Sequence, residues 1–200
     1  MNPYVLLAKE TVENYIKEGK IIEVPKDLPE EFLHRKSGTF VTIMKNKELR
    51  GCIGTYLPTR KNIAEEIIQN AIAAATEDYR FGPIQKRELS SLSYTVYILE
   101  KPELVKDIKE LNPQKYGIIV KTTPITYPDG TDVVFNEFSI HFTSPRFNGH
   151  FVSKSALLLP DLAGIDTVEK QISITCRKGG IDPSKEKIII YKFKVEKFEQ

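Results

Sequence analysis

Apolar residues recur every three or four positions in three stretches of the chain, which is the spacing of one face of an α-helix. These stretches cover residues 4–17, 63–78 and 166–180. Asn62 with Glu65, and Asp166 with Glu169, have the spacing of capping boxes at the starts of the last two. The pattern therefore predicts three amphipathic helices. The second half of the helix over 63–78 is rich in alanine, so we expect a sheet or another backbone to approach it closely.

Runs of β-branched and aromatic residues, bounded by turn residues, predict the strands. They cover 39–44, 49–56, 94–99, 117–122, 133–135, 139–142, 156–160 and 187–198. A turn over 45–48 joins the first two strands as a hairpin, residues 103–111 are expected to form a short helix, and 123–153 reads as a hairpin-rich excursion. Helices and strands do not alternate regularly, so the sequence predicts an α+β fold with mainly antiparallel sheet.

Composition narrows the classes of protein without selecting one. The chain has 200 residues, enough for one domain or a closely joined pair, and 29 Lys and Arg against 27 Asp and Glu give a net charge of +2. A protein that binds nucleic acid through a field of one sign is therefore not expected. The cations include 22 Lys, and there are 23 Ile but only five Gln, a bias that resembles hyperthermophile usage.

The location and cofactors are predicted from what the sequence lacks. The longest unbroken apolar runs are five residues, and the first residues have no signal-peptide pattern. Two cysteines and no paired Cys or His motif argue against a disulfide scaffold and against a metal site. We therefore expect a cytoplasmic protein without a membrane segment, a metal or a cofactor.

The strand over 49–56 carries the strongest chemical candidate. Alternation places Arg50 and Cys52 on one face, where a guanidinium would stabilise a thiolate and make it nucleophilic. Gly51 and Gly54 leave room for a ligand or a second backbone. The alternative is a buried cysteine that behaves as a small hydrophobic residue, with the glycines needed for strand crossing.

Two further charged residues accompany this cysteine. Asp78 and Arg80 follow the alanine-rich helix and could serve as acid and anion anchor at the mouth of a site. The alternative for them is a salt-bridged helix end of little energetic importance. Cys176, four residues after Ile172, belongs to an apolar helical stripe and is expected in the core.

The segment Leu-Arg-Gly-Cys-Ile-Gly-Thr at residues 49–55, here called the signature segment, resembles that of the AMMECR domain family. Residues 75–81 with Pro83, 88–89, 157–160 and 178–180 also match. The resemblance implies a single unit over 1–200, of the stand-alone archaeal type. It further implies a larger lobe of antiparallel sheet flanked by helices, built from the N- and C-terminal portions, and a smaller antiparallel β lobe near 112–160. The signature segment would lie near their junction. Memo-like and radical-SAM proteins are the partners that it suggests.

Three functional hypotheses remain open. In the first, a cleft between the lobes, lined by Arg50, Cys52, Asp78 and Arg80, binds a small anionic ligand. Cys52 and Asp78 are its catalytic candidates, and Arg50, Gly51, Gly54, Thr55 and Arg80 are its ligand-binding candidates. In the second, the chain is a non-catalytic binding or scaffold module for partner proteins or nucleic acid. In the third, the C-terminal lysines and Tyr191 or Phe193 bind RNA.

Overall fold

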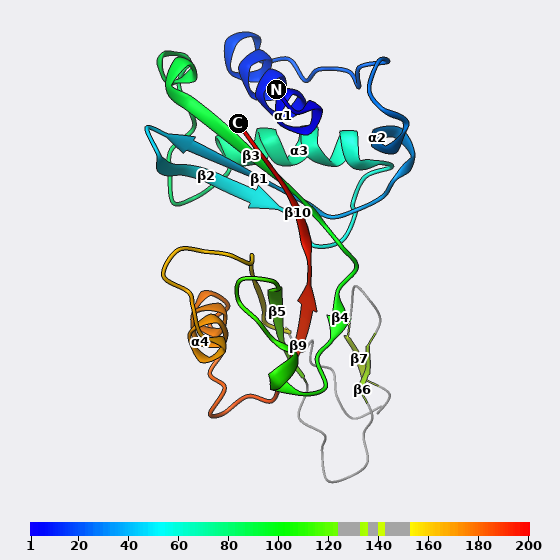
Figure 1. Cartoon of the computed structure of the whole chain (residues 1–200), viewed down its shortest axis with the longest axis vertical. Helices are drawn as coiled ribbons and strands as arrows, with labels where there is room; N and C mark the ends of the chain where they lie inside the picture. Colours follow the sequence, from blue (N-terminus) through cyan, green and yellow to red (C-terminus); the bar gives the residue numbers. More distant parts are fainter. Residues whose placement is uncertain (124–132, 136–139, 143–152) are drawn as a thin grey trace. The chain divides into compact units, whose positions relative to one another are not determined.

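A computed structural model describes residues 1–123, 133–135, 140–142 and 153–200 (Figure 1). The chain divides into two compact units. The first unit holds residues 1–101 and 195–200, and the second unit holds residues 102–194. Each has its own antiparallel sheet and its own apolar core, so the predicted α+β class is confirmed. The lobe near 112–160 that the family resemblance implies stays a prediction.

The first unit is a four-stranded antiparallel sheet covered by helices. Its elements are α1 (Pro3–Glu18), α2 (Glu30–His34), β1 (Thr39–Lys45), β2 (Glu48–Gly54), α3 (Ile63–Thr76), the 3-10 helix η1 (Lys86–Ser91), β3 (Leu92–Leu99) and β10 (Val195–Glu199). The strand order is β10-β3-β1-β2, which leaves β2 as an edge strand (Figure 1). The signature segment therefore begins on an outer edge of this sheet.

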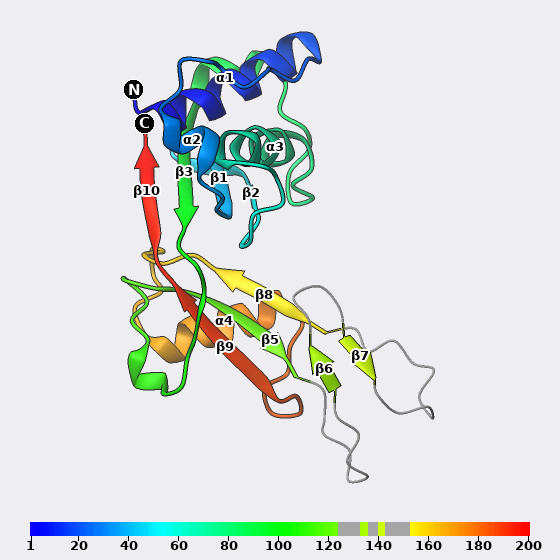
Figure 2. The same cartoon turned by 90° about the vertical axis from the view of Figure 1, so that its right-hand side faces the viewer.

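Alternate residues of the sheet point to α1 and α3, which pack on one of its faces (Figure 2). Val41 lies opposite Ile53 on β2 and Val96 on β3, and all three belong to the core. The predicted start of α3 is confirmed, because the Asn62 side chain accepts the backbone N–H of Glu65. The pattern of the sequence thus defined which sheet face meets the helices.

Gly51 explains how α3 lies so close to β2. A Cβ atom at this position would come within 3.0 Å of the backbone oxygen of Ala74, a separation that real Cβ atoms essentially never show. The alanines of α3 remove bulk on the other side of the same contact. The close approach predicted for the alanine-rich half of this helix is confirmed.

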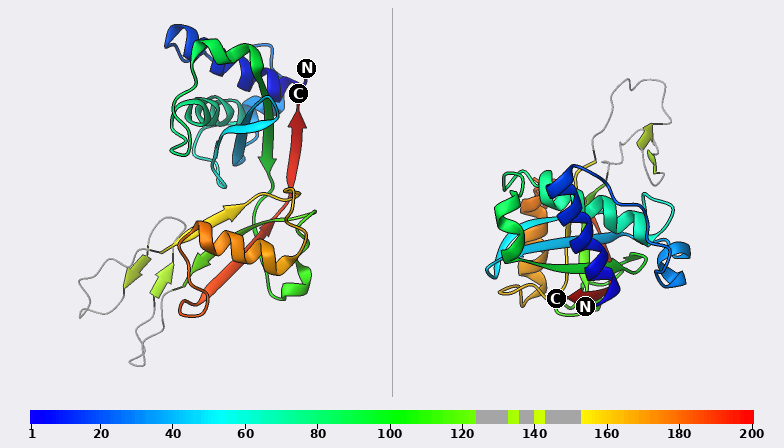
Figure 3. Two further views of the ribbon diagram at one scale, coloured as in Figure 1. Left: turned by 90° about the vertical axis from the view of Figure 1, so that its left-hand side faces the viewer. Right: turned by 90° about the horizontal axis from the view of Figure 1, so that it is seen from above.

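The second unit pairs one helix with a second four-stranded sheet. Its elements are β4 (Glu103–Leu104), the 3-10 helix η2 (Ile108–Glu110), β5 (Gly117–Thr122), β6 (Val133–Phe135), β7 (Ile140–Phe142), β8 (Ser155–Leu158), α4 (Val168–Lys178) and β9 (Ile188–Phe193). The strand order is β4-β9-β5-β8, and β6 pairs with β7. Helix α4 packs on β5 and β8 (Figure 3). Cys176 lies in this core, as its helical stripe predicted.

Three predictions about elements were wrong in part. No helix spans 103–111: Glu103 and Leu104 pair with β9, and the Asp107 side chain caps the single 3-10 turn that follows. Helix α4 begins after Thr167, whose hydroxyl accepts the N–H of Lys170, and not after Asp166. The strand expected over 187–198 is divided at Lys194, because β9 pairs with β5 in the second unit and β10 pairs with β3 in the first.

The described helices were also compared with the span of a bilayer. None of the helices in the described ranges is both long enough and apolar enough to cross a membrane. The predicted location in the cytoplasm stays a prediction.

Candidate functional site

Cys52 lies in β2, at a point where the strand edge is closed by side chains. It stands opposite Thr42 of β1, and 3.2 Å separates the Thr42 hydroxyl oxygen from the Cys52 sulfur. On the outer side of the strand, the Asp78 carboxylate accepts the Cys52 backbone N–H at 2.9 Å, and Arg80 Nη2 lies 3.5 Å from the Cys52 carbonyl oxygen. The residues after α3 thus take the place of a further strand at this point.

Asp78 anchors this arrangement. The residue is 4% exposed, and its carboxylate also accepts the backbone N–H, Nε and Nη2 of Arg80. These hydrogen bonds from the Arg80 side chain, with the backbone bond from Cys52, lower the pKa of Asp78 to about 2 against the effect of burial. The group is therefore a carboxylate at neutral pH, and its geometry favours anchoring over the predicted role as an acid.

Arg80 is the cation of the cluster. Its guanidinium lies 5.4 Å from the centre of the Phe81 ring, and 44% of its side chain is exposed. Hydrogen bonding to Asp78 raises the pKa of Arg80, and the nearby charge of a Cys52 thiolate acts in the same direction. The structure therefore brings Asp78, Arg80 and Cys52 together, as the sequence proposed.

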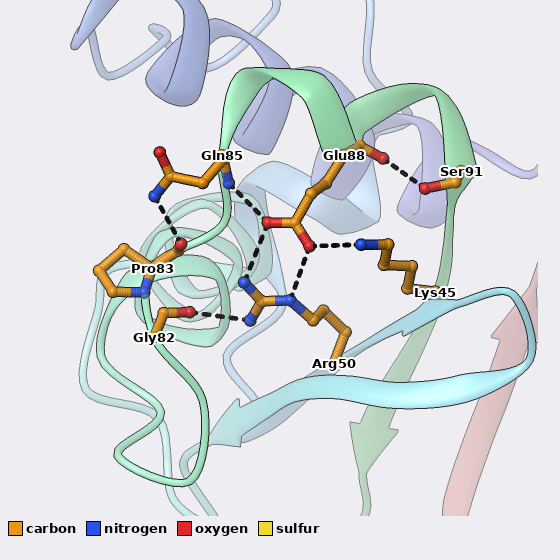
Figure 4. A network of polar contacts seen from close by, with 7 residues as sticks. All are labelled: Lys45, Arg50, Gly82, Pro83, Gln85, Glu88 and Ser91. Carbon is orange, nitrogen blue, oxygen red and sulfur yellow. Dashed lines mark hydrogen bonds and ion pairs between the residues drawn. The ribbon is translucent and has the colours of Figure 1, made fainter.

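Arg50 takes a different role from the one predicted beside the thiol. Its Nε and Nη2 donate to the two carboxylate oxygens of Glu88, both at 3.1 Å, and its Nη1 donates to the Gly82 carbonyl at 2.8 Å (Figure 4). Lys45 and the backbone N–H of Gln85 complete the shell around Glu88. The hydrogen bond from Arg50 is the largest cause that lowers the pKa of Glu88, to about 2.

The other predicted ligand-binding residues lie among protein groups. A Cβ on Gly51 would meet Ala74, and one on Gly54 would meet Phe40 and the backbone of Thr39. The Thr55 hydroxyl donates to Glu66 at 2.6 Å. Whether Gly51, Gly54 or Thr55 also contacts a ligand stays a prediction.

Glu66 is a buried carboxylate that the sequence analysis missed. It is 1% exposed and accepts four neutral donors: the hydroxyls of Thr55 and Thr59, and the backbone N–H groups of Thr59 and Arg60. Asn70, one turn further along α3, donates to the Thr39 carbonyl and hydroxyl. The loop after the signature segment is therefore held by a carboxylate on the inner face of α3. Glu66 occupies a position that helical periodicity assigns to the core, and this is the signal that could have found it.

Glu88 and Thr42 were also missed. Glu88 stands 38 residues after Arg50, and nothing in their spacing predicts an ion pair. Thr42 would have been found from the hairpin register, which places it beside Cys52. Within the described residues, no group of three or more His, Cys, Asp and Glu side chains is placed to hold a metal ion. Both cysteines are outside any disulfide.

The comparisons agree with this α+β arrangement around an edge-strand signature. The AMMECR1 family profile matches residues 5–198, so the chain belongs to the AMMECR1 family. A protein of Thermotoga maritima is 43% identical over 199 residues, which are 99% of this chain and 98% of that protein. The protein CA_C1420 of Clostridium acetobutylicum is 39% identical over the whole chain, which spans 36% of its length.

A solved structure has the same fold. The crystal structure of the uncharacterized protein PH0010 from Pyrococcus horikoshii is similar with a TM-score of 0.78 and 31% identity, over 98% of this chain and 89% of that one. The family is thereby established for this chain. The relatives come in part from thermophiles, in keeping with the lysine-rich and isoleucine-rich composition.

Proposed function

We propose that the edge of β2 and the residues after α3 bind a small anion, with Arg80 as its cation and Cys52 as an ionisable thiol beside it. The observation that carries this proposal is the state of Arg80. A buried carboxylate fixes one edge of its guanidinium while 44% of the side chain remains exposed. Within the described ranges, Nη1 of this guanidinium makes no hydrogen bond and supplies donors to an anion.

A fixed arginine of this kind suits an oxyanion. The parallel Nε and Nη2 donors of the guanidinium are taken by Asp78, so the N–H groups of Nη1 remain to donate charge-assisted hydrogen bonds to carboxylate or phosphate oxygens. The Phe81 ring against the guanidinium and its bonds to Asp78 restrict its rotamers before a ligand arrives. Less conformational entropy is then lost on binding, which favours affinity. Carboxylates and phosphates are therefore the ligand classes that this site would take.

Cys52 gives the same site a reactive group. The positive charge of Arg80, and the hydrogen bond that the Thr42 hydroxyl would donate to a deprotonated sulfur 3.2 Å away, both favour a thiolate over a thiol. A thiolate is the nucleophilic form and the form that oxidants attack. Cys52 therefore serves as a nucleophile or redox thiol for a bound anionic ligand, the enzymatic form of this proposal.

The test compares the alkylation of Cys52 in the native chain and in Arg80→Gln. Iodoacetamide forms the S–C bond and releases iodide, and peptide mass spectrometry follows Cys52 and Cys176 separately over pH 6–10. Loss of the Arg80 charge should raise the apparent pKa of the Cys52 reaction and slow it about three- to tenfold at pH 7. Identical profiles in the two chains would overturn the thiolate part.

The anion part has its own measurement. Inorganic phosphate should slow the alkylation of Cys52 in the native chain, with saturation, and should have no saturable effect in Arg80→Gln. Sodium chloride at equal ionic strength is the control, because it screens charge without binding as an oxyanion. Equal effects of phosphate and chloride would contradict specific anion binding.

A second candidate function is the non-catalytic binding or scaffold module. Two observations favour it: the glycines of the signature segment lie against backbone, and the Tyr79 side chain beside Arg80 belongs to a residue that is 95% exposed. Tyrosine and arginine are common anchors of protein interfaces. A partner of the Memo-like or radical-SAM class would then bind the native chain more tightly than Tyr79→Ser, with phosphate binding unchanged.

RNA binding has weaker support in the second unit. Of the two rings proposed to stack on bases, Phe193 is 2% exposed, while Tyr191 is partly exposed with the Lys121 ammonium 5.7 Å from its ring centre. Only Tyr191 could stack on a base as the unit is folded. Salt-dependent binding of a mixed oligonucleotide pool that Tyr191→Ala abolishes would be the evidence for this function.

A further inference from the structure

The guanidinium of Arg50 connects three parts of the first unit. Arg50 projects from β2, the strand that also contains Cys52, and its side chain is 15% exposed. Two of its nitrogens donate to Glu88 of η1 and the third donates to the Gly82 carbonyl (Figure 4). A residue required only for an ion pair with Glu88 would not need the third bond.

That third bond lies at the end of a short turn that contains Arg80. The turn covers residues 78–82 and is closed by the hydrogen bond from the Phe81 N–H to the Asp78 carbonyl, at 2.9 Å. At its start, the Asp78 carboxylate accepts the N–H of Cys52, and at its end Gly82 accepts Arg50. Both ends of the turn are therefore fixed to β2, at positions two residues apart.

Glu88 supplies the rigid support for this connection. Its carboxylate is almost fully buried and has four donors, from Arg50, Lys45 and the backbone of Gln85. The bidentate contact orients the guanidinium plane, so that Nη1 is directed at Gly82 without freedom to rotate away. The orientation of Arg50 is thus determined by a group outside the turn that it holds.

We propose that Arg50 is a positioning residue, which fixes the turn 78–82 on β2 and thereby keeps Arg80 beside Cys52. The proposal rests on the proposed function of Arg80. It assigns to the arginine of the signature segment an action on Cys52 through the turn, without contact with the thiol. Asp78 and Arg50 act on the two ends of the same turn.

The decisive variant is Arg50→Lys. A lysine ammonium can keep the ion pair with Glu88, but it lacks the planar fork that reaches Glu88 and Gly82 together. We expect the unfolding midpoint of Arg50→Lys to stay near that of the native chain, while the pH profile of Cys52 alkylation moves toward that of Arg80→Gln. The expected slowing at pH 7 is about two- to fivefold, smaller than for Arg80→Gln because the cation is displaced and not removed.

Lys45→Gln is the matched control. It removes another cation from the same oxygen of Glu88 without touching Gly82 or the turn. Its alkylation profile should coincide with that of the native chain. Burial raises the pKa of the Cys176 thiol. An increase in the alkylation rate of Cys176 would show that a variant has also disturbed the fold away from the substituted residue.

The outcomes separate the two proposals. If Arg80→Gln changes the profile of Cys52 and Arg50→Lys does not, positioning by Arg50 is wrong and the function of Arg80 stands. If Arg80→Gln has no effect, the proposed function fails whatever Arg50→Lys does. If the pH profile of Cys52 alkylation shifts as much in Lys45→Gln as in Arg50→Lys, the effect is due to the charge of Glu88. That result would also overturn the positioning role.

Discussion

The regions around the two cysteines each pair a helix with an antiparallel sheet, but charged side chains lie near Cys52 and aliphatic side chains lie near Cys176. In the first unit, α3 packs on a sheet whose edge strand carries Cys52, and in the second unit α4 packs on a sheet and carries Cys176 itself. The buried carboxylate of Asp78 accepts the Cys52 N–H, and the buried carboxylate of Glu88 binds Arg50 on the same strand. Around Cys176 lie aliphatic side chains such as Val120 and Ile181.

The two regions differ in the charged groups that they bury. Burying a carboxylate costs free energy unless its oxygens are hydrogen-bonded, and an aliphatic core avoids this cost altogether. The first unit nevertheless buries Glu66, Asp78 and Glu88. Glu88 binds Arg50, and Asp78 binds Arg80. The Arg80 side chain remains 44% exposed near the Cys52 thiol. In the second unit, residues of α4 and of the sheet form the apolar core around Cys176.

The largest change in the free energy of unfolding is expected at Gly51, where β2 lies directly against the backbone of α3. Gly51→Ala places a Cβ against the backbone oxygen of Ala74, so either α3 or β2 must shift, and the free energy of unfolding should fall by about 3 kcal/mol. Gly82→Ala is the matched control, because a Cβ there meets nothing within 4 Å. Urea denaturation measures both. Equal stability of the two variants would show that the contact of α3 with β2 relaxes freely.

The buried carboxylates predict a loss of stability in acid. The pKa values of Asp78 and Glu88 are both lowered to about 2, so each carboxylate stabilises the folded chain above the unfolded pKa near 4. This contribution, about 2 kcal/mol for Asp78 and about 3 kcal/mol for Glu88, is lost as the pH falls from about 4.5 to about 2. The protection factors of β2 amides, that is, the intrinsic exchange rate divided by the observed rate at each pH, should therefore fall over that range. In Asp78→Asn the fall should be smaller, and an unchanged pH dependence of the protection factors would contradict the lowered pKa.

The two thiols should react at very different rates in the native chain. Cys52 is partly exposed and near a cation, whereas Cys176 is 2% exposed. If Cys176 reacts only after an opening that costs about 2 kcal/mol, iodoacetamide at pH 8 should modify Cys52 about 30-fold faster. Peptide mass spectrometry measures both rates in one sample, and denaturant should abolish the difference. Equal native rates would place Cys52 among inert structural cysteines.

The smallest effect is expected for the buried amide of α4. Gln171 donates to the Tyr116 carbonyl at 2.8 Å, but among the described residues its Oε1 has no hydrogen-bond partner. Gln171→Met removes one good bond together with one unpaired acceptor, so the free energy of unfolding should change by about 1 kcal/mol at most. Asn70→Leu, which breaks the bonds to Thr39 in the first unit, should cost more. The reverse order would contradict the contrast between the two units.

The sequence predicted most of the elements because their signals are local. The Asn62 cap, the apolar stripe through Cys176 and the hairpin of β1 and β2 each depend on residues close together in the chain. The prediction was wrong where pairing with a segment far along the chain determines the secondary structure. Glu103 and Leu104, for example, pair with β9 and do not form a helix. A capped turn at Asp107 replaced the helix because one turn already satisfies its backbone donors.

The candidate site divides in the same way. Alternation along the strand drew attention to Arg50 and Cys52, and the position of Asp78 and Arg80 after the alanine-rich helix added these two residues, which contact each other and Cys52 in the structure. It could not reveal that Glu88 takes the guanidinium of Arg50, since an ion pair across 38 residues depends on how η1 folds back over β2. The residue expected to activate the thiol instead donates to Glu88 and to the Gly82 carbonyl.

What the sequence by itself determined is the α+β class, the family, the strand that carries the signature segment and the contrast between a core cysteine and a candidate one. These follow from short-range periodicity and from a low-degeneracy motif. Only the tertiary structure decided which cation lies beside Cys52 and which carboxylate orients each arginine. The physical reason is that charge pairing depends on distances in space between residues far apart in the chain, and no local pattern records those distances.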